Sequence, residues 1–489
     1  MTTTIDTDFE VVIGLEVHSQ LLTRSKMFCS CSTGYANALP NTHVCPVCMG
    51  MPGVLPVINQ EAVTYTIMTA LALNCSIPEY SKFDRKNYPY PDLMKGYQIS
   101  QYDIPLSRDG YLMIEVNGQQ RRIGITRVHL EEDTARLQHY PGYSLIDVNR
   151  AGTPLMEIVS EPDMRSPEEA RLYMQKLREI LVYLGVASGR MEEGSLRCDA
   201  NVSVRPRGEQ KLGVKTEIKN MNSFRAVERA LEFEAQRQVD IIRKGGKIHQ
   251  ETRGWVEDKG ITVGQRSKEH ANDYRYFPEP DLPPLIINRQ RVEEIRANLA
   301  ELPDARRARY QADYGLSQQD ANVMTEDKAL GDYFEQVMHV SQTQDHKARA
   351  KAASNWLLSE VVRLLKANSI EIQQSPLQPA ALANLLDLLD RQRITGKQAK
   401  EILDDAFASG ELPETIVEKK GIKPPITDES ALERIVEEVI AQNEQIANDY
   451  RGGKTNAIQA LMGRVMKQTR GQARAEIVLT LLKRKLGEA

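Results

Sequence analysis

The hydrophobic pattern of this chain changes its period, and the change coincides with the proline-rich run at residues 278–284. Before that run, apolar and polar residues alternate in short stretches such as VVIGLEVHSQ at 11–20, the pattern of half-buried β-strands. After it, apolar residues recur every three or four positions, which is typical of amphipathic helices. A second stretch rich in proline and glycine, ELPETIVEKKGIKPPITDE, then interrupts the helices. We therefore predict an α+β fold with a mostly antiparallel β cradle and helices at 1–295, an all-α domain at 296–412 and a C-terminal tail domain at 413–489.

Two helices are predicted within the cradle. In RSPEEARLYMQKLREILVYLG, Ser166 is suited to cap the helix, Pro167 to its first turn, and Glu169 to complete a capping box. The second helix is expected from about Ser223 to the glycine pair that begins at Gly245. Two tail helices carry apolar stripes made of Leu432, Ile435, Val436, Val439 and Ile440, and of Ile458, Leu461, Met462, Val465 and Met466.

Composition indicates an ordinary globular protein. Of 489 residues, 41% are apolar and 27% are charged, and the net charge is −4. No stretch approaches 18 uninterrupted apolar residues, and the N-terminus lacks the basic and apolar regions of a signal peptide. We therefore expect a cytoplasmic protein without a membrane partner.

Four of the six cysteines form two close pairs, Cys29 with Cys31 and Cys45 with Cys48. This spacing predicts a tetrahedral thiolate site for zinc, and four thiolates would leave no open coordination position. Such a zinc ion would be structural. The alternative is a set of free thiols. The two remaining cysteines are isolated and are expected in the packed core.

Four strand-like stretches carry acidic residues on a polar face. Because side chains alternate along a strand, Glu131 shares a face with His129, while Glu132 lies on the opposite one. The candidates that could converge in one cradle are Glu16, His18, Glu131, Asp199 and Glu217. Carboxylates with at most one imidazole suit Mg²⁺ better than Zn²⁺. The alternative is the ordinary solvated face of an antiparallel sheet.

The C-terminal tail is basic. From residue 451 to the end, nine Lys or Arg residues face two acidic ones. Such a patch binds phosphates or is simply a solvated helix face, and the sequence leaves both open. The candidate nucleic-acid contacts are Arg451, Lys454, Arg464, Lys467 and Arg470. Gly453-Lys454-Thr455 resembles the end of a P-loop, but the required earlier glycine is Asn448, so we reject a nucleotide site there.

Several long stretches resemble one family. They are IGLEVHSQL, GMPGVLPVIN after the cysteines, RKNYPYPDLMKGYQISQYD, HLEEDTA, DVNRAGTPLMEIVSEPD, GSLRCDANVSVRP and KTEIKNMNSFRAVERALEFE. Together they resemble the B subunit of bacterial aspartyl-/glutamyl-tRNA amidotransferases, and YRGGKTNAIQALMGRVMKQTRG is similar to the C-terminal RNA-binding domain of that family. The resemblance covers essentially the whole chain.

The resemblance implies a reaction and partners. Members use ATP and Mg²⁺ to phosphorylate the side-chain carboxylate of tRNA misacylated with Glu or Asp, and ammonia then displaces the phosphate. The ammonia comes from glutamine hydrolysed on an amidase (A) subunit, and the pair is braced by a small C subunit. The motifs do not distinguish Glu-tRNA from Asp-tRNA.

The resemblance also implies roles for residues. The five acidic-face candidates match the metal-binding positions of the family, and Glu132 and Lys86 match residues at the mouth of its ammonia channel. Weaker candidates for contacts with ATP or the aminoacyl group are Asn149, Arg150, Ser195, Arg197, Asn201, Lys219 and Asn220.

Two other functions are compatible with parts of the sequence. A non-catalytic RNA-binding adaptor with a zinc knuckle would explain the cysteines and the basic tail, but not the acidic strand faces. A stand-alone metal-dependent phosphohydrolase would explain the acids and would need no partner.

Overall fold

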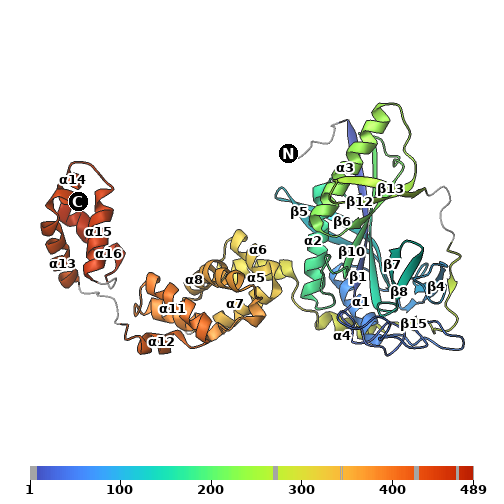
Figure 1. Cartoon of the computed structure of the whole chain (residues 1–489), viewed down its shortest axis with the longest axis horizontal. Helices are drawn as coiled ribbons and strands as arrows, with labels where there is room; N and C mark the ends of the chain where they lie inside the picture. The colour runs from blue at the N-terminus through green and yellow to red at the C-terminus, as the bar shows by residue number, and fades with distance from the viewer. Residues whose placement is uncertain are drawn as a thin grey trace. The chain divides into compact units, whose positions relative to one another are not determined.

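The computed structural model describes residues 8–267, 274–341, 343, 345–422, 429–469 and 473–487, and the chain divides into two compact units, 1–303 and 304–489 (Figure 1). The first unit combines sheets and helices. The second unit is helical throughout its described residues apart from turns and connections. The predicted α+β class, with strands first and helices after them, is therefore confirmed.

An eight-stranded sheet forms the centre of the first unit. Its strands follow the order β13 (Ile261–Ser267), β12 (Glu251–Val256), β11 (Thr216–Met221), β10 (Leu196–Pro206), β1 (Phe9–Gln20), β9 (Pro154–Ser160), β6 (Gln119–Glu132) and β5 (Ser107–Val116). Neighbouring strands are antiparallel, except that β11 and β12 run parallel. β10 and β11, which follow one another in the chain, pair antiparallel.

Two long helices cover one face of this sheet, α2 (Pro167–Tyr183) and α3 (Phe224–Arg243) (Figure 1). Ser166 caps α2 as predicted, and Ser223, near which the second helix was expected to start, caps α3; each side chain accepts a backbone N–H bond. The predicted capping box is wrong, because the Glu169 carboxylate accepts from the N–H of Arg165 and pairs with Arg121 instead. The apolar sides of β1 and β10 pack under these helices in one continuous core.

Smaller elements complete the first unit. A three-stranded sheet joins β14 (Phe277–Pro278), β3 (Asp84–Asn87) and β4 (Tyr97–Ser100). Two ribbons pair β2 (Tyr80–Ser81) with β15 (Leu285–Ile286), and β7 (Arg136–Tyr140) with β8 (Tyr143–Asp147). The helices α1 (Gln60–Ala72) and α4 (Arg289–Ala297) pack together, and α1 was not predicted from the sequence. Its threonines and β-branched residues favour a strand locally, so tertiary packing decides this helix.

The second unit contains two hydrophobic cores, each described by itself. The first is built by α5 (Pro303–Tyr314), α6 (Gln318–Glu326), α7 (Lys328–Val340), α8 (His346–Trp356), the π-helix η1 (Leu357–Val361), α9 (Val362–Asn368), the 3₁₀ turn η2 (Ile372–Gln374), α10 (Pro379–Asp390), α11 (Gly396–Ser409) and α12 (Pro413–Lys419). The second is built by α13 (Glu429–Gln442), α14 (Glu444–Arg451), α15 (Ala457–Gln468) and α16 (Ala475–Leu486). The predicted stripes of α13 and α15 point into the second core.

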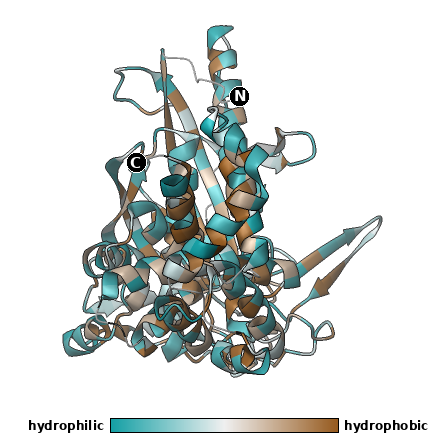
Figure 2. Cartoon of the chain, turned by 90° about the vertical axis from the view of Figure 1, so that its left-hand side faces the viewer, coloured by the Kyte–Doolittle hydropathy of each residue, from teal (hydrophilic) through white to brown (hydrophobic). Residues whose placement is uncertain are grey.

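The helices are amphipathic. Figure 2 shows hydrophobic and hydrophilic residues on different sides of them, in agreement with the buried stripes of both cores. Within the described ranges, every helix is too short or too polar to cross a lipid bilayer.

Candidate functional site

The face of the large sheet opposite α2 and α3 carries the predicted acidic residues. Register brings them together, because Glu16 of β1 lies opposite Asp199 of β10. On the other side of β1, His18 lies opposite Glu157 of β9. On β10 and β11, Asn201 lies opposite Glu217. We call this surface the acidic face.

One group on the acidic face is centred on His18. Its Nε2 lies 3.3 Å from Oε1 of Glu131 and 3.7 Å from Oε2 of Glu157, and His129 Nε2 lies 3.2 Å from the same Glu157 oxygen. Burial opposes protonation of His18, but hydrogen bonds to the two carboxylates raise its pKa to about 10. Burial is likewise outweighed at Glu131 and Glu157, whose pKa values are lowered by the neighbouring histidines.

A second group is centred on Lys219. Its Nζ lies 2.5 Å from Asp199 and 3.3 Å from Glu217, and the Thr252 hydroxyl donates to Glu217 at 2.8 Å. The pairing of β10 with β11 is irregular at this point. Asn220, the residue after Lys219, has a φ of 67° in the left-handed region, which asparagine tolerates. The irregularity adjoins Asp199 and so shapes the site.

Glu16 lies between the two groups. It accepts a hydrogen bond from the Asn201 amide at 3.0 Å. Burial raises the pKa of Glu16, and the negative charges of Glu157, Asp199 and Glu217 raise it further. The acidic face therefore holds more negative charge than its own side chains neutralise, and a bound cation would relieve this.

The donors on the acidic face fit Mg²⁺, because they are carboxylate oxygens with one imidazole. The ligand atoms of His18, Glu131 and Glu157 lie within 4.8 Å of one another. The five predicted ligands thus occupy one face, but in two groups. Glu157 was not predicted, and its only local signal is a lone acid between Met156 and Ile158 in an apolar strand.

Glu132 lies on the other side of β6 from Glu131, as the alternation predicts. Its carboxylate pairs with Lys95 and accepts the backbone N–H of Ile99 at 3.0 Å. It lines a pocket of about 210 Å³ together with residues of the cysteine loops, among them Phe28, Cys48 and Met51.

Lys86 has different neighbours from Glu132. Burial opposes its protonation, but the carboxylates of Glu131 and Glu157 outweigh this and raise the pKa of Lys86. The structure therefore associates Lys86 with the acidic face, and Glu132 with Lys95 and the pocket.

Two predicted arginines converge on a buried acid that the sequence pattern did not single out. Arg197 Nη2 lies 2.9 Å from Asp133 Oδ2, and Arg150 Nε lies 3.7 Å from Asp133 Oδ1. The Gln20 amide also donates to Asp133 at 2.7 Å. Burial raises the pKa of Asp133, but the two arginines outweigh it and the net pKa is lowered. Arg197 stands opposite His18 in the sheet, so it borders the acidic face.

Two other predicted contacts are used inside the fold. The Asn149 side chain accepts from the N–H of His43 at 2.8 Å and donates to the carbonyl of Leu39 at 2.8 Å. The Ser195 hydroxyl donates to the carbonyl of Arg190 at 2.8 Å. In this conformation both side chains hold loops in place.

The four predicted zinc ligands, Cys29, Cys31, Cys45 and Cys48, converge with all sulfur atoms within 4.8 Å of one another. The N–H of Cys45 donates to Cys48 Sγ at 3.1 Å, which favours a thiolate there. The hydrogen bond from Cys29 lowers the pKa of Cys48 to about 4. This donor set fits a tetrahedral zinc ion. Cys75 and Cys198 are buried in the core, as predicted.

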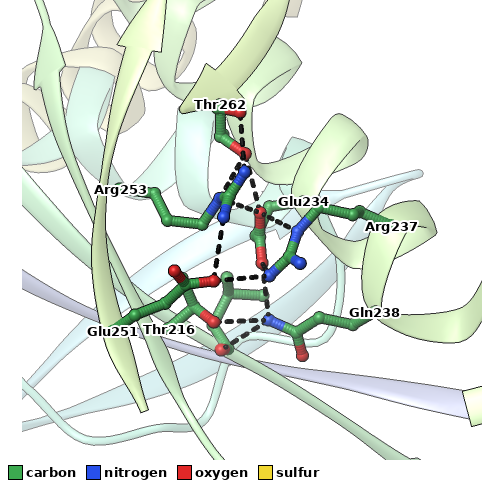
Figure 3. A network of polar contacts seen from close by, with 8 residues as sticks. Thr216, Glu234, Arg237, Gln238, Glu251, Arg253 and Thr262 are labelled. Carbon is green, nitrogen blue, oxygen red and sulfur yellow. Dashed lines mark hydrogen bonds and ion pairs between the residues drawn. The ribbon is translucent and has the colours of Figure 1, made fainter. Parts of the chain in front are cut away.

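Behind the acidic face, on the α3 side of the same strands, lies a second buried carboxylate, Glu234 (Figure 3). It is fully buried, and Arg237 grips both of its oxygens at 2.9 and 2.6 Å. The Thr262 hydroxyl donates to it at 2.8 Å and the Gln238 amide at 3.0 Å, while Arg253 lies 3.4 Å away. We call these residues the Glu234 network.

The basic residues of the tail differ in their surroundings. Lys454 pairs with Asp449 at 3.0 Å, and Arg451 is exposed beside Asn448. Arg464 and Lys467 are exposed one turn apart on α15, and no ion pair involves either of them within the described ranges. The predicted Arg470 lies outside the described residues.

Comparison with known proteins identifies the family of this chain. The GatB/GatE catalytic domain matches residues 11–293, and the GatB domain matches residues 332–486, so the chain belongs to the GatB family. It is 55% identical over 483 residues to the B subunit of the aspartyl/glutamyl-tRNA(Asn/Gln) amidotransferase of Moorella thermoacetica, covering 98% of this chain and all of that protein. It is 54% identical over 486 residues to the protein of the same name from Carboxydothermus hydrogenoformans, covering 98% and 99%.

Proposed function

We propose that this chain is the tRNA-binding and ATP-using subunit of a glutamine-dependent tRNA amidotransferase. It activates the side-chain carboxylate of Glu-tRNA(Gln), Asp-tRNA(Asn) or both by phosphorylation, and ammonia then replaces the phosphate to form the amide. The observation that carries the proposal is the convergence of five acids and a histidine with Lys219 and Arg197 on one sheet face. Phosphoryl transfer depends mainly on such positioning and charge, and it needs no protein nucleophile.

Each group of the acidic face has a proposed role. His18, Glu131 and Glu157 would hold one magnesium ion, and Glu16, Asp199 and Glu217 would hold another. Magnesium bound there would neutralise the charge that develops on the transferring phosphoryl group. Lys219, Arg197 and Asn201 would bind phosphate oxygens once ATP is present. In support, Lys219 and Asn201 bond to carboxylates on this face, and Arg197 bonds to Asp133 beside it. Arg150, Asn149, Ser195 and Asn220 would position the surrounding loops.

Glu132 and Lys86 are proposed to control the protonation of the ammonia that arrives from the partner. Ammonia must stay unprotonated to attack, so its route needs groups that accept or exclude protons. Glu132 stands in the pocket beside the cysteine loops, and the carboxylates of the acidic face keep Lys86 cationic. Glu132 would therefore act first, in the pocket, and Lys86 would act at the acidic face.

The remaining parts would support this chemistry. Zinc held by the four cysteines would brace the loop that follows β1. The exposed Arg464 and Lys467, with Arg451, Lys454 and Arg470, would bind tRNA phosphates. The partners would be an amidase (A) subunit and a small C subunit, and the assembly would work in the cytoplasm.

One experiment tests the proposal directly. The assembled enzyme is given Glu-tRNA and Asp-tRNA with ATP, limiting Mg²⁺, and either glutamine or ammonium. Asp199→Ala and Glu217→Ala should abolish phosphorylation of the aminoacyl group whether glutamine or ammonium is supplied. The binding of tRNA should stay normal. Glu132→Gln should retain ATP use and amidation from ammonium, but lose amidation from glutamine. If the Asp199 and Glu217 variants phosphorylate at the wild-type rate, the proposal is wrong.

The same assay separates the alternatives. A zinc-knuckle adaptor would bind tRNA without turning over ATP, and a stand-alone phosphohydrolase would hydrolyse ATP without aminoacyl-tRNA. No feature of the described residues favours either one.

A further inference from the structure

Five tyrosine rings from two distant segments form a continuous array beside the acidic face. Tyr102 and Tyr276 stack with their centroids 4.2 Å apart and their planes 7° apart. The edge of Tyr274 meets Tyr276 at 5.9 Å and Tyr88 at 6.0 Å, and Tyr88 stacks on Tyr90 at 5.9 Å. The array thus connects the β3–β4 region with the segment that leads into β14.

Tyr102 ends this array with one face of its ring open. The residue is 56% exposed although Tyr276 covers one face of its ring. The main chain is nevertheless fixed, because the N–H of Tyr102 donates to the buried Asp84 carboxylate at 3.0 Å. A flat apolar ring face is therefore presented to solvent on a rigid support.

The array borders the acidic face through Lys86. The ammonium of Lys86 lies 5.1 Å from the Tyr274 ring centroid, a cation–π distance. The same lysine responds to the charges of Glu131 and Glu157, and so does the phenol of Tyr276. Nearer to Tyr102 in the chain, the Ser100 hydroxyl at the end of β4 donates to Glu131 at 3.3 Å, so the segment that carries Tyr102 leaves the acidic face two residues earlier.

Packing alone accounts for the inner rings but not for Tyr102. The segment before β14 is already held by Asn87, whose amide donates to the carbonyls of Tyr274 and Arg275 at 3.2 and 2.9 Å. Arg85 adds a two-point bond to the buried Glu279. Tyr102 is therefore not required to secure this segment, and more than half of it is exposed.

We propose that the open face of Tyr102 is a stacking platform for the nucleobase at the single-stranded 3′ end of the aminoacyl-tRNA. The proposal rests on the proposed function and names the subsite that receives this part of the substrate. Proteins hold unpaired bases by stacking them on aromatic side chains. The terminal nucleotide carries the amino acid, whose carboxylate must reach the acidic face that adjoins the platform. The other candidate for stacking is the adenine of ATP, and the test separates the two.

Binding is tested with deacylated tRNA whose terminal adenine is replaced by the fluorescent base 2-aminopurine, which stacking quenches. The wild-type assembly should quench this fluorescence. Tyr102→Ala should lose the quenching, and Tyr102→Phe should keep it because the ring remains. Tyr140→Ala is the matched control, since Tyr140 is 46% exposed on the β7–β8 ribbon and stacks on Tyr143. It should quench like the wild type.

Kinetics supply the second readout. Tyr102→Ala should raise the KM for aminoacyl-tRNA at least about fivefold, because a base stacked on an aromatic ring contributes that much or more. The KM for ATP should change less than about twofold. A raised KM for ATP with an unchanged KM for tRNA would assign the platform to adenine of ATP and overturn the proposal. Normal amidation with unchanged quenching in Tyr102→Ala would overturn the platform alone, whereas a wild-type assembly that amidates no aminoacyl-tRNA would overturn the proposed function.

Discussion

The two faces of the central sheet each bury carboxylates, but they treat them differently. On the α3 side, Glu234 accepts hydrogen bonds from two guanidinium nitrogens of Arg237, from a threonine hydroxyl and from a glutamine amide, and Arg253 lies nearby. On the other side, Glu16 is surrounded by three acids and, among the described residues, accepts one hydrogen bond, from Asn201. The fold supplies cationic partners to the first carboxylate, whereas the second lies among like charges.

The same strands build both environments. Thr216 and Glu217 are neighbours on β11, yet Thr216 contacts Gln238 of the Glu234 network while Glu217 faces Lys219. On β12, Arg253 joins the network and the preceding Thr252 donates to Glu217. The comparison teaches that burial and charge do not by themselves distinguish the carboxylates of the two faces. Glu234 has several internal donors, whereas Glu16 lies among acids.

The largest expected effect on stability is at Glu234, on the α3 side of the sheet. Glu234→Ala removes the fully buried carboxylate that lies between Arg237 and Arg253 and leaves Glu251 as the acid that still pairs with both, and breaking a buried pair costs about 3–5 kcal/mol. We expect the free energy of unfolding of the first unit to fall by that amount. Urea unfolding can be followed through Trp255 of β12 in a Trp356→Phe background, because these are the two tryptophans of the chain.

The matched variant on the acidic face is Glu16→Gln, measured in metal-free protein. It should leave the unfolding free energy equal to the wild type or higher, because it removes one of several crowded negative charges. A loss as large as that of Glu234→Ala would erase the distinction between the two faces.

The next effect is the response to magnesium. A ligand that binds only the folded state adds about 2.7 kcal/mol at a hundred times its Kd. Millimolar Mg²⁺ should therefore raise the urea midpoint of the wild type but not that of a Glu16→Gln/Asp199→Asn double variant. Glu234→Gln should still respond to Mg²⁺. Equal responses in all three proteins would show that the acidic face binds no magnesium.

A smaller effect is expected where the two faces are linked. Thr252→Val removes the hydroxyl that donates to Glu217, and a hydrogen bond to a charged group contributes about 1.5–3 kcal/mol. The Mg²⁺ concentration for half-maximal phosphorylation should rise about tenfold, whereas Thr252→Ser should restore the wild-type value. If Val and Ser behave alike, Thr252 acts through packing and does not position Glu217.

The smallest effect concerns the same contrast among the cations of the tail. Lys467 is exposed, and no ion pair involves it within the described ranges, whereas Lys485 is bound to Glu433 and Glu437. Lys467→Gln should weaken tRNA binding a few-fold and reduce the slope of log affinity against log salt by about one unit. Lys485→Gln should leave that slope unchanged. Filter binding at several salt concentrations measures both.

Alternation of polar and apolar residues was enough to predict the side of its strand on which each acidic residue lies. It placed Glu16, His18, Asp199 and Glu217 on polar sides of strands and separated Glu131 from Glu132, because side-chain direction depends only on local geometry.

Contacts that depend on strand order were beyond a local pattern. Glu157 joins His18 only because β9 inserts between β1 and β6, and Thr252 reaches Glu217 only because β12 runs parallel beside β11. The failed capping box has the same cause, since Arg121 of the distant β6 takes the Glu169 carboxylate. Lys86 and Glu132 are likewise separated because Lys86 interacts with Glu131, whereas the side chain of Glu132 lies on the other side of β6.

The position of β1 in the middle of the sheet has a consequence for biosynthesis. This strand is complete at residue 20, but its two neighbours end only at residues 160 and 206. At about 5–20 residues per second, roughly 10–40 s of translation separate β1 from the end of β10. Until β9 is complete at residue 160, the apolar residues of β1 have no pairing strand in the sheet, and the covering helix α2 ends only at residue 183. A ribosome that stalls before β9 emerges would therefore leave an apolar, unpaired strand at the start of the nascent chain.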